Sequence, residues 1–262
     1  AGVPRILNVG NFHCDFDAGG KPAPTHWPRI AKTRLRREYD LASRILLASE
    51  YAAETFRSCG VPGEKLIVVH RGVDTEKFRP LAERPSRPFV VATCGYLGER
   101  KGTTHLLRAW KRLDLPDAEL WLIGKVPADE EAGLRALAGD SVHFLGFRRD
   151  LPKLMPRAHA HVLLSRNEGF AKVLLEAAAS GVVNVCTAET GWPKEAPGAL
   201  MIADRSNDEE VAAAIERLFQ NPEQLQRRAQ EARDWVLGHL TWAHFRARFR
   251  TVLESLSAPP VA

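Results

Sequence analysis

From about residue 88 onward, short apolar runs alternate with amphipathic segments along the chain. Runs that are apolar throughout are typical of strands buried on both faces, and amphipathic segments between them predict helices covering a parallel sheet. The alternation therefore predicts repeated β–α–β units, that is, an α/β fold with a doubly wound, Rossmann-like domain. The expected strands span 88–95, 118–124, 141–146, 160–165, 182–187 and 198–203. The expected helices span 103–113, 129–139, 150–158, 169–180, 208–219 and 222–237.

The expected strands also predict where a ligand binds. In an open parallel sheet, ligands lie beyond the carboxyl ends of the strands. Gly95, Gly124, Gly146 and Glu168 fall at or just after such ends. We therefore expect the functional residues of this domain near these positions.

The first 80 residues are less regular. The segments 5–10, 44–49 and 65–74 read as strands, and 29–42 and 49–60 read as helices, the second capped by Ser49. The stretch 78–88 holds three prolines and reads as a linker. We expect a partial N-terminal α/β domain with its linker over 1–80 and a C-terminal domain over 81–240.

Composition limits the class of protein. With 262 residues, 45% of them hydrophobic, the chain can bury a sizeable core. The net charge of +5 favours anionic small molecules, phosphates or an acidic membrane surface, and is too small by itself to indicate nucleic acid. The four cysteines, Cys14, Cys59, Cys94 and Cys186, lack metal-ligand or redox spacing, so we expect reduced thiols in the cytoplasm. No apolar run reaches the length of about 18 residues that a membrane span needs.

Two features suggest a phosphate site. The expected helix after Glu168 begins with the backbone amides of Gly169, Phe170 and Ala171, and a helix N-terminus attracts anions. In "GERKG", Arg100 and Lys101 precede another helix start, where cations oppose the helix dipole unless an anion lies between them. A solvated basic turn is the alternative for this second feature.

Two glutamates lie eight residues apart, at 168 and 176. Glu168 precedes a helix start, where dipole compensation alone would explain a carboxylate. Glu176 either forms an exposed pair with Lys172, four residues earlier, or is buried among small residues. A buried carboxylate needs hydrogen-bond donors, and two vicinal sugar hydroxyls would supply them.

The segment around these two glutamates, with several others, resembles a known family. "NEGFAKVLLEAAASG" resembles the E-x7-E segment of the retaining glycosyltransferases of the GT-B fold, especially family 4. "KLIVVHRGVDTEKFRP" is similar to the interdomain stretch of that family, and "CGYLGERKGTTHLLRAW" to its first strand and phosphate turn. "AELWLIG", "VHFLGF" and "LASRILLASEYAAETF" match as well. The resemblance covers roughly residue 40 to the end.

The resemblance implies that the C-terminal domain binds a nucleotide-diphosphate sugar. Glu176 would hold the ribose hydroxyls, Glu168 would contact the donor sugar, and Arg100 and Lys101 would neutralise the leaving diphosphate without an obligatory metal. The amides of residues 169–171 would meet the diphosphate and sugar. The remaining donor-binding residues on this basis are Gly95, Phe147 and Arg148, the last two beside the base.

Some positions depart from the family pattern. Tyr96 stands where the family often has an arginine, and Ala171 stands where a glycine is common. His13 would correspond to a histidine that faces the donor sugar in some members, with an ordinary strand-end histidine as the competing interpretation. Only about 80 residues precede the linker, whereas a GT-B enzyme has two domains of similar size. We therefore predict a truncated or incomplete glycosyltransferase.

The expected activity is transfer of a sugar from a nucleotide-diphosphate sugar to a hydroxyl acceptor: a glycan, a lipid or a small molecule. The alternatives are a GT-B nucleotide-sugar epimerase or hydrolase and a non-catalytic nucleotide-sugar-binding module. We expect no nucleic-acid partner.

We also make predictions for two further helices, one in the N-terminal part and one at the C-terminal end. The basic helix at 28–40 is expected either to contact anionic lipid at the inner membrane face or to be solvated. The segment 241–262 resembles the helix that crosses back to the first domain, where Trp242, Phe245 and Phe249 would pack. Packing of these rings on their own domain is the alternative.

Overall fold

The computed structural model describes residues 5–9 and 29–257, so His13 lies outside the described residues. The larger sheet has six parallel strands in the order β6-β5-β4-β7-β8-β9, which confirms the expected doubly wound α/β fold. Its strands are β4 (Phe89–Tyr96), β5 (Ala118–Lys125), β6 (Val142–Gly146), β7 (Ala160–Leu163), β8 (Val183–Thr187) and β9 (Leu200–Ile202).

The strand order reverses beside β4. The chain adds β5 and β6 on one side of β4, and then returns to place β7, β8 and β9 on the other. β4 and β7 are paired in parallel, with Val91 opposite Ala160. At such a reversal the following loops leave toward opposite faces of the sheet and open a crevice beyond the strand ends.

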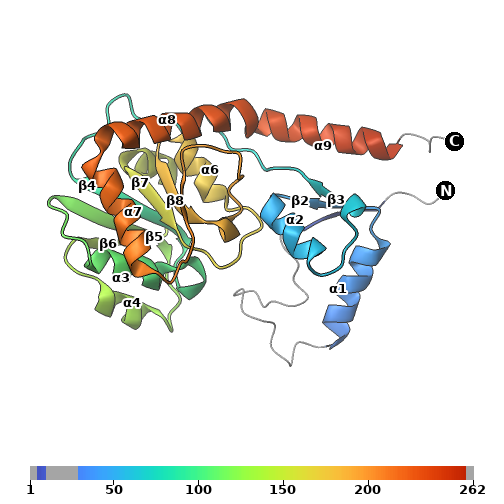
Figure 1. Cartoon of the computed structure of the whole chain (residues 1–262), viewed down its shortest axis with the longest axis horizontal. Coiled ribbons are helices and arrows are strands. Elements are labelled where there is room, and N and C mark those ends of the chain that lie inside the picture. Colours follow the sequence, from blue (N-terminus) through green and yellow to red (C-terminus); the bar gives the residue numbers. More distant parts are fainter. Residues whose placement is uncertain (1–4, 10–28, 258–262) are drawn as a thin grey trace.

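Helices cover both faces of this sheet (Figure 1). They are α3 (Thr103–Lys111), α4 (Glu131–Leu137), α5 (Leu151–Leu154), α6 (Lys172–Ala179), α7 (Asp208–Gln220) and α8 (Pro222–His239). Apolar residues of α3, α4 and α7 pack against Val91, Leu120 and Val162 on one face. Ala177 of α6 packs against Val90 and Ala92 on the other. Both faces are therefore buried, which explains why the strands are apolar throughout.

One expected helix is broken. The segment expected as a helix over 150–158 divides into α5 and the 3-10 turn η3 (Met155–Arg157). Pro156 lies at the start of η3 and has no N–H to continue the α5 ladder. The other 3-10 turns are η1 (Gly63–Lys65), η2 (Glu99–Lys101) and η4 (Ala188–Thr190).

The N-terminal part forms a second, smaller sheet. Its parallel strands are β1 (Ile6–Asn8), β2 (Arg44–Leu47) and β3 (Leu66–Val68), in the order β1-β2-β3. Its helices are α1 (Arg29–Leu41) and α2 (Glu50–Arg57). Tyr39 of α1, Ile45 of β2 and Phe56 of α2 lie in one buried cluster. As expected, Ser49 caps α2, its hydroxyl accepting from Ala52 N at 3.1 Å.

The C-terminal helix α9 (Trp242–Ser257) runs on from α8 and lies along the smaller sheet (Figure 1). Val252 of α9 is buried with Leu46 and Val69, and Phe245 and Phe249 pack against this cluster. Two contacts therefore connect the C-terminal part of the chain to its N-terminal part. One is the packing of α9 on the smaller sheet, and the other is a parallel bridge between Val73 and Thr241. Among the described residues, no helix is long and apolar enough to cross a membrane.

Candidate functional site

The crevice between β4 and β7 brings three predicted residues together. Glu168 follows β7, and Arg100 and Lys101 belong to η2, which follows β4. Glu168 Oε1 lies 2.5 Å from Lys101 Nζ and 2.8 Å from Arg100 Nη1. It also accepts a hydrogen bond from Ser165 Oγ at 3.0 Å. The basic turn is therefore not simply solvated: its two cations converge on one carboxylate at the topological switch point.

The surroundings of Glu168 decide its charge. Burial by itself would raise the pKa of this carboxyl, since only 16% of the side chain is exposed. The charges of Lys101 and Arg100, with the hydrogen bonds from Lys101 and Ser165, outweigh burial and hold the pKa below its ordinary value. Glu168 is thus ionised, and its pair of cations leaves a local excess of positive charge.

Glu176 lies within α6 and is buried, with 8% of the residue exposed. Lys172 Nζ lies 3.1 Å from its Oε1, so the predicted pair forms, but the carboxylate is not on an exposed face. Burial raises the pKa of Glu176, and the charges of Lys172 and Lys77 oppose that shift only in part. Sequence reasoning missed Lys77, a residue of the interdomain stretch whose charge acts on this carboxylate and which lines the same cavity.

Glu176 lines a cavity of about 440 Å³ together with Lys77, Lys172, Phe147 and Arg148. A carboxylate at the wall of such a cavity can accept hydrogen bonds from paired hydroxyl groups of a ligand. The side chains around it supply positive charge, which suits an anionic ligand.

A second cavity of about 320 Å³ lies at the carboxyl ends of β4 and β5 and is lined by Gly95, Tyr96, Phe147 and Arg148, among others. Phe147 and Tyr96 are 66% and 55% exposed, so two aromatic rings border an open pocket. Arg148 is held by Asp150, with Nε 2.8 Å from Oδ1. Phe147 and Arg148 line both cavities, which are therefore neighbours.

Gly95 connects this second cavity with the cations. A Cβ built at Gly95 would lie 3.6 Å from Lys101 Cε, and the φ of Gly95 is +134°, a value that side chains rarely adopt. The lysine therefore passes over a position without a side chain. The predicted residues form a continuous line from Glu168 through Lys101 and Gly95 to the aromatic pocket.

The expectation for residues 169–171 is partly wrong. The helix α6 begins at Lys172, three residues later than predicted, with Ala171 as its N-cap. The amides of Glu168 and Ala171 donate to the carbonyls of Glu189 and Thr190, both at 2.9 Å. This segment therefore pairs with η4 and does not form a helical turn. The Ala171 amide is thus occupied and not free for a phosphate.

Gly169 and Phe170 lie before α6, in the segment that follows Glu168. Within the part of the chain that the structure describes, their amides make no hydrogen bond. Gly169 O accepts from Ser49 Oγ at 2.5 Å, and the Phe170 ring lies 5.7 Å from that of His70. Both residues therefore contact the N-terminal part, and their amides remain available beside the site.

In the turn after β4, the backbone amides of Gly98 and Glu99 are already hydrogen-bonded, so side chains and not these amides can contact a ligand. Gly98 N donates to Thr103 Oγ1 at 3.0 Å, and Glu99 N donates to Glu130 Oε2 at 2.6 Å. A Cβ at Gly98 would lie 2.8 Å from the Glu130 carboxylate, so glycine permits this approach. Sequence reasoning missed Glu130, because a loop carboxylate 31 residues away from Glu99 carries no local signal.

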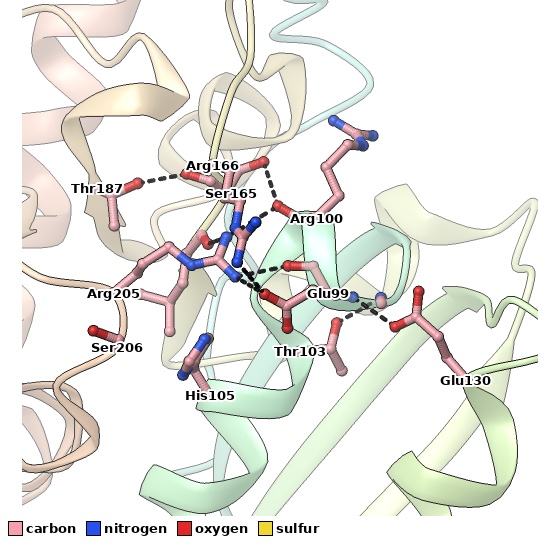
Figure 2. A network of polar contacts seen from close by, with 12 residues as sticks. Glu99, Arg100, Thr103, His105, Glu130, Ser165, Arg166, Thr187, Arg205 and Ser206 are labelled. Carbon is pink, nitrogen blue, oxygen red and sulfur yellow. Dashed lines mark hydrogen bonds and ion pairs between the residues drawn. The ribbon is translucent and has the colours of Figure 1, made fainter. Parts of the chain in front are cut away.

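A wider polar network holds this turn on the loop after β7 (Figure 2). Arg205, from the loop after β9, donates to Glu99 O and to Glu99 Oε1 at 2.8 and 2.7 Å. Arg166 Nη2 donates to Glu99 Oε1 at 2.8 Å. Neither arginine was predicted from the sequence, since tertiary contacts alone bring them to Glu99.

The described residues contain no group of three or more His, Cys, Asp or Glu side chains arranged to hold a metal ion. A third cavity, of about 510 Å³, lies between α2 and residues 188–201. None of the predicted donor residues lines it.

Comparison with known proteins now settles the family. The model of the family "Glycosyl transferases group 1" matches residues 74–235, and that of "Glycosyltransferase Family 4" matches residues 3–77. The chain belongs to the glycosyl transferases group 1 family. Its fold is that of the GT-B glycosyltransferases, as the resemblance implied.

Curated relatives of this family member include two mannosyltransferases. The MMP alpha-(1->4)-mannosyltransferase of Mycolicibacterium hassiacum is 28% identical over 91% of this chain and 60% of the relative. The GDP-mannose-dependent alpha-(1-6)-phosphatidylinositol monomannoside mannosyltransferase of Mycolicibacterium smegmatis is 28% identical over 97% of this chain and 71% of the relative. The chain thus spans about 60–70% of the length of these relatives.

Solved structures agree on the fold of this glycosyl transferases group 1 member. Anabaena Alr3699/HepE, solved with UDP and glucose, superposes with a TM-score of 0.77 at 21% identity and covers 96% of this chain and 72% of its own. Sucrose-phosphate synthase from Thermosynechococcus elongatus gives a TM-score of 0.79 at 19% identity, covering 96% and 67%.

Proposed function

We propose that this chain binds a nucleotide-diphosphate sugar in the crevice between β4 and β7 and transfers the sugar, with retention, to a hydroxyl acceptor. The observation that carries the proposal is the convergence of Lys101 and Arg100 on Glu168 at the switch point. This cluster continues past Gly95 into the cavities lined by Phe147 and Glu176. The line of residues matches the order sugar, diphosphate, ribose and base.

Each group along this line has a chemical task. The diphosphate lies against Lys101 and Arg100, which neutralise the charge that develops as the sugar–phosphate bond breaks. These side chains supply that charge without an obligatory metal. Glu176 accepts hydrogen bonds from the two ribose hydroxyls, and the base lies in the pocket bordered by Phe147 and Tyr96. Glu168 contacts the donor sugar near its reacting carbon.

The names of similar proteins favour a hexose donor but point to two bases. The mycobacterial relative named above is GDP-mannose-dependent, while Alr3699/HepE was solved with UDP and UDP-glucose. The first is similar to this chain in sequence and the second in fold. The first donors to test are therefore GDP-mannose and UDP-glucose.

Turnover with and without acceptor separates transfer from its alternatives. A transferase consumes donor only when a hydroxyl acceptor is present, whereas an epimerase or hydrolase consumes donor alone. Donor binding without turnover in either assay would leave a nucleotide-sugar-binding module. Nuclear magnetic resonance of the product's anomeric proton reports retention, and an inverted product would contradict that part of the proposal.

We also propose that the acceptor is met at the inner face of a membrane, with the chain cytoplasmic and peripheral. Arg34, Arg36 and Arg37 of α1 are exposed, and basic helices bind anionic lipid. Cosedimentation with phosphatidylglycerol vesicles, but not with phosphatidylcholine vesicles, is the expected result. Equal binding to both vesicles, or binding to neither, would contradict it.

A further inference from the structure

Arg205 makes an unusual set of contacts for a residue in a connecting loop. Its guanidinium donates to three backbone carbonyls, those of Glu99, Arg100 and Leu164, and to the Glu99 carboxylate. Only 14% of its side chain is exposed. All four of these bonds reach the two loops that carry the proposed diphosphate site.

The Arg100 carbonyl is the centre of this arrangement. It accepts from Ser165 Oγ at 3.2 Å, from Arg166 N at 3.0 Å and from Arg205 Nη1 at 3.4 Å. Thr187 Oγ1, from the end of β8, ties the same loop by donating to Ser165 O at 3.0 Å. Loops from three different strands therefore meet at one peptide group of η2.

The charges along η2 point in two directions. The Glu99 carboxylate faces Arg166 and Arg205, whereas the Arg100 side chain points away from Arg205 (Figure 2). Arg100 and Lys101 instead reach Glu168. Holding Glu99 on one side thus fixes the direction in which the two cations are presented on the other.

Close packing between η2 and the loop after β7 makes the position of η2 sensitive to small movements. Gly102 has a φ of +73°, and a Cβ there would collide with the Leu164 carbonyl, which is itself a partner of Arg205. The turn and the β7 loop are therefore in direct contact at Gly102, and losing Arg205 would release the turn from this contact. A displacement of about 1 Å in a charged group can change its effect on a bound anion substantially.

We infer that Arg205 is a positioning residue for the diphosphate: through Glu99 and the Arg100 carbonyl, it holds η2 so that Arg100 and Lys101 meet the ligand. This inference rests on the proposed donor site. It assigns no contact between Arg205 and the ligand. The inference predicts that loss of Arg205 weakens binding of the diphosphate but not binding of the nucleoside.

The test measures dissociation constants of UDP, GDP, uridine and guanosine for the whole chain by calorimetry. Arg205→Ala should weaken binding of the preferred diphosphate about ten-fold, the usual scale for losing charge-assisted hydrogen bonds, and leave the nucleoside unchanged. Arg205→Lys, which keeps the charge, should recover part of the loss. Arg112→Ala is the matched control, since Arg112 pairs with Glu209 on an exposed surface and should bind as the unaltered chain does.

Lys101→Ala separates this inference from the proposed site. In that background Arg205→Ala should have a much smaller effect, because both changes act through the same cation. If Lys101→Ala weakens the diphosphate but neither Arg205 variant does, the positioning role is wrong and the donor site stands. If Lys101→Ala has no effect, or the unaltered chain binds no diphosphate, the donor site itself is wrong.

A role in stability alone predicts a different pattern. Arg205→Ala would then weaken nucleoside and diphosphate equally, and Arg205→Lys would restore the melting temperature and both affinities together. Either result would overturn the inference. Where Arg205→Ala does not fold, Glu99→Gln provides the second test, since the amide keeps an acceptor but loses the charge that holds both arginines.

Discussion

Glu168 and Glu176 lie eight residues apart and are both largely buried, yet their environments shift their pKa values in opposite directions. Burial acts to raise both values. At Glu168, Lys101 and Arg100 overcome burial and lower the pKa, whereas at Glu176 the half-exposed Lys172 and the more distant Lys77 do not. The comparison shows that the cations, and not the depth of burial, separate the two carboxylates.

The difference corresponds to the two proposed roles. A carboxylate held as an anion between two cations belongs where charge develops and is transferred. A carboxylate that is buried with little compensation is more stable once hydroxyl donors reach it. The Glu168 cluster would thus serve the chemistry, and Glu176 would serve binding.

The largest effect is expected at the cation nearest to Glu168. Replacing Lys101 by alanine should lower the kcat for sugar transfer roughly 100-fold, since one stabilising group for the leaving diphosphate is lost. Lys111→Ala, an exposed lysine on α3, is the control and should keep full activity. Equal activity of the two variants in a donor-turnover assay would remove Lys101 from the mechanism.

A smaller effect, on binding, is expected at Glu176. Glu176→Ala should weaken nucleotide binding about ten-fold or more, the scale of lost hydrogen bonds to a charged group, with the change mostly in KM and not in kcat. Glu216→Ala, on an exposed face of α7, provides the control. A variant that lowers kcat and leaves KM unchanged would contradict a ribose contact.

The smallest effect is on stability, where the two glutamates should differ in sign. The folded pKa of Glu168 is lowered, so its stabilisation is present at neutral pH and is lost as the pH falls below the ordinary value. The folded pKa of Glu176 is raised, so its charge destabilises the fold at neutral pH.

At pH 7, Glu168→Gln should therefore lower the melting temperature and Glu176→Gln should raise it, by roughly 2–4 °C each. Differential scanning fluorimetry of the free protein measures both. The Glu168 difference should shrink as the pH is lowered toward 4. Shifts of the same sign at pH 7 would mean that the cations around Glu168 do not outweigh its burial.

The fold followed from local patterns. Each of the six expected strands from residue 88 onward was found, because a buried parallel strand must be apolar along its length. The Ser49 cap was equally local, since the hydroxyl and its partner Ala52 N are three residues apart. Where local reasoning failed, at residues 169–171, the competing partner was the carbonyl of Thr190, on another loop.

In the candidate site too, residues in local motifs were predicted and a residue brought in by tertiary contacts was not. Arg100, Lys101, Glu168 and Glu176 stand in short motifs, and their meeting follows from the ends of adjacent parallel strands. Arg205 gave no signal, because its role depends on a loop more than 100 residues from its partners Glu99 and Arg100. The residues proposed to bind the donor were thus predictable from motifs, and the residue proposed to position them was not.

The affinity of nucleoside diphosphate for Glu168→Gln and Glu176→Gln, measured side by side with the unaltered chain, tests the central contrast most directly. Without sugar, the Glu168 carboxylate competes with the diphosphate for Lys101 and Arg100. Glu168→Gln should therefore bind UDP or GDP a few-fold more tightly, about 1 kcal/mol, while Glu176→Gln binds more weakly. Weaker binding by Glu168→Gln, or unchanged binding by both variants, would contradict the assignment of the diphosphate to the cations beside Glu168 and of the ribose to Glu176.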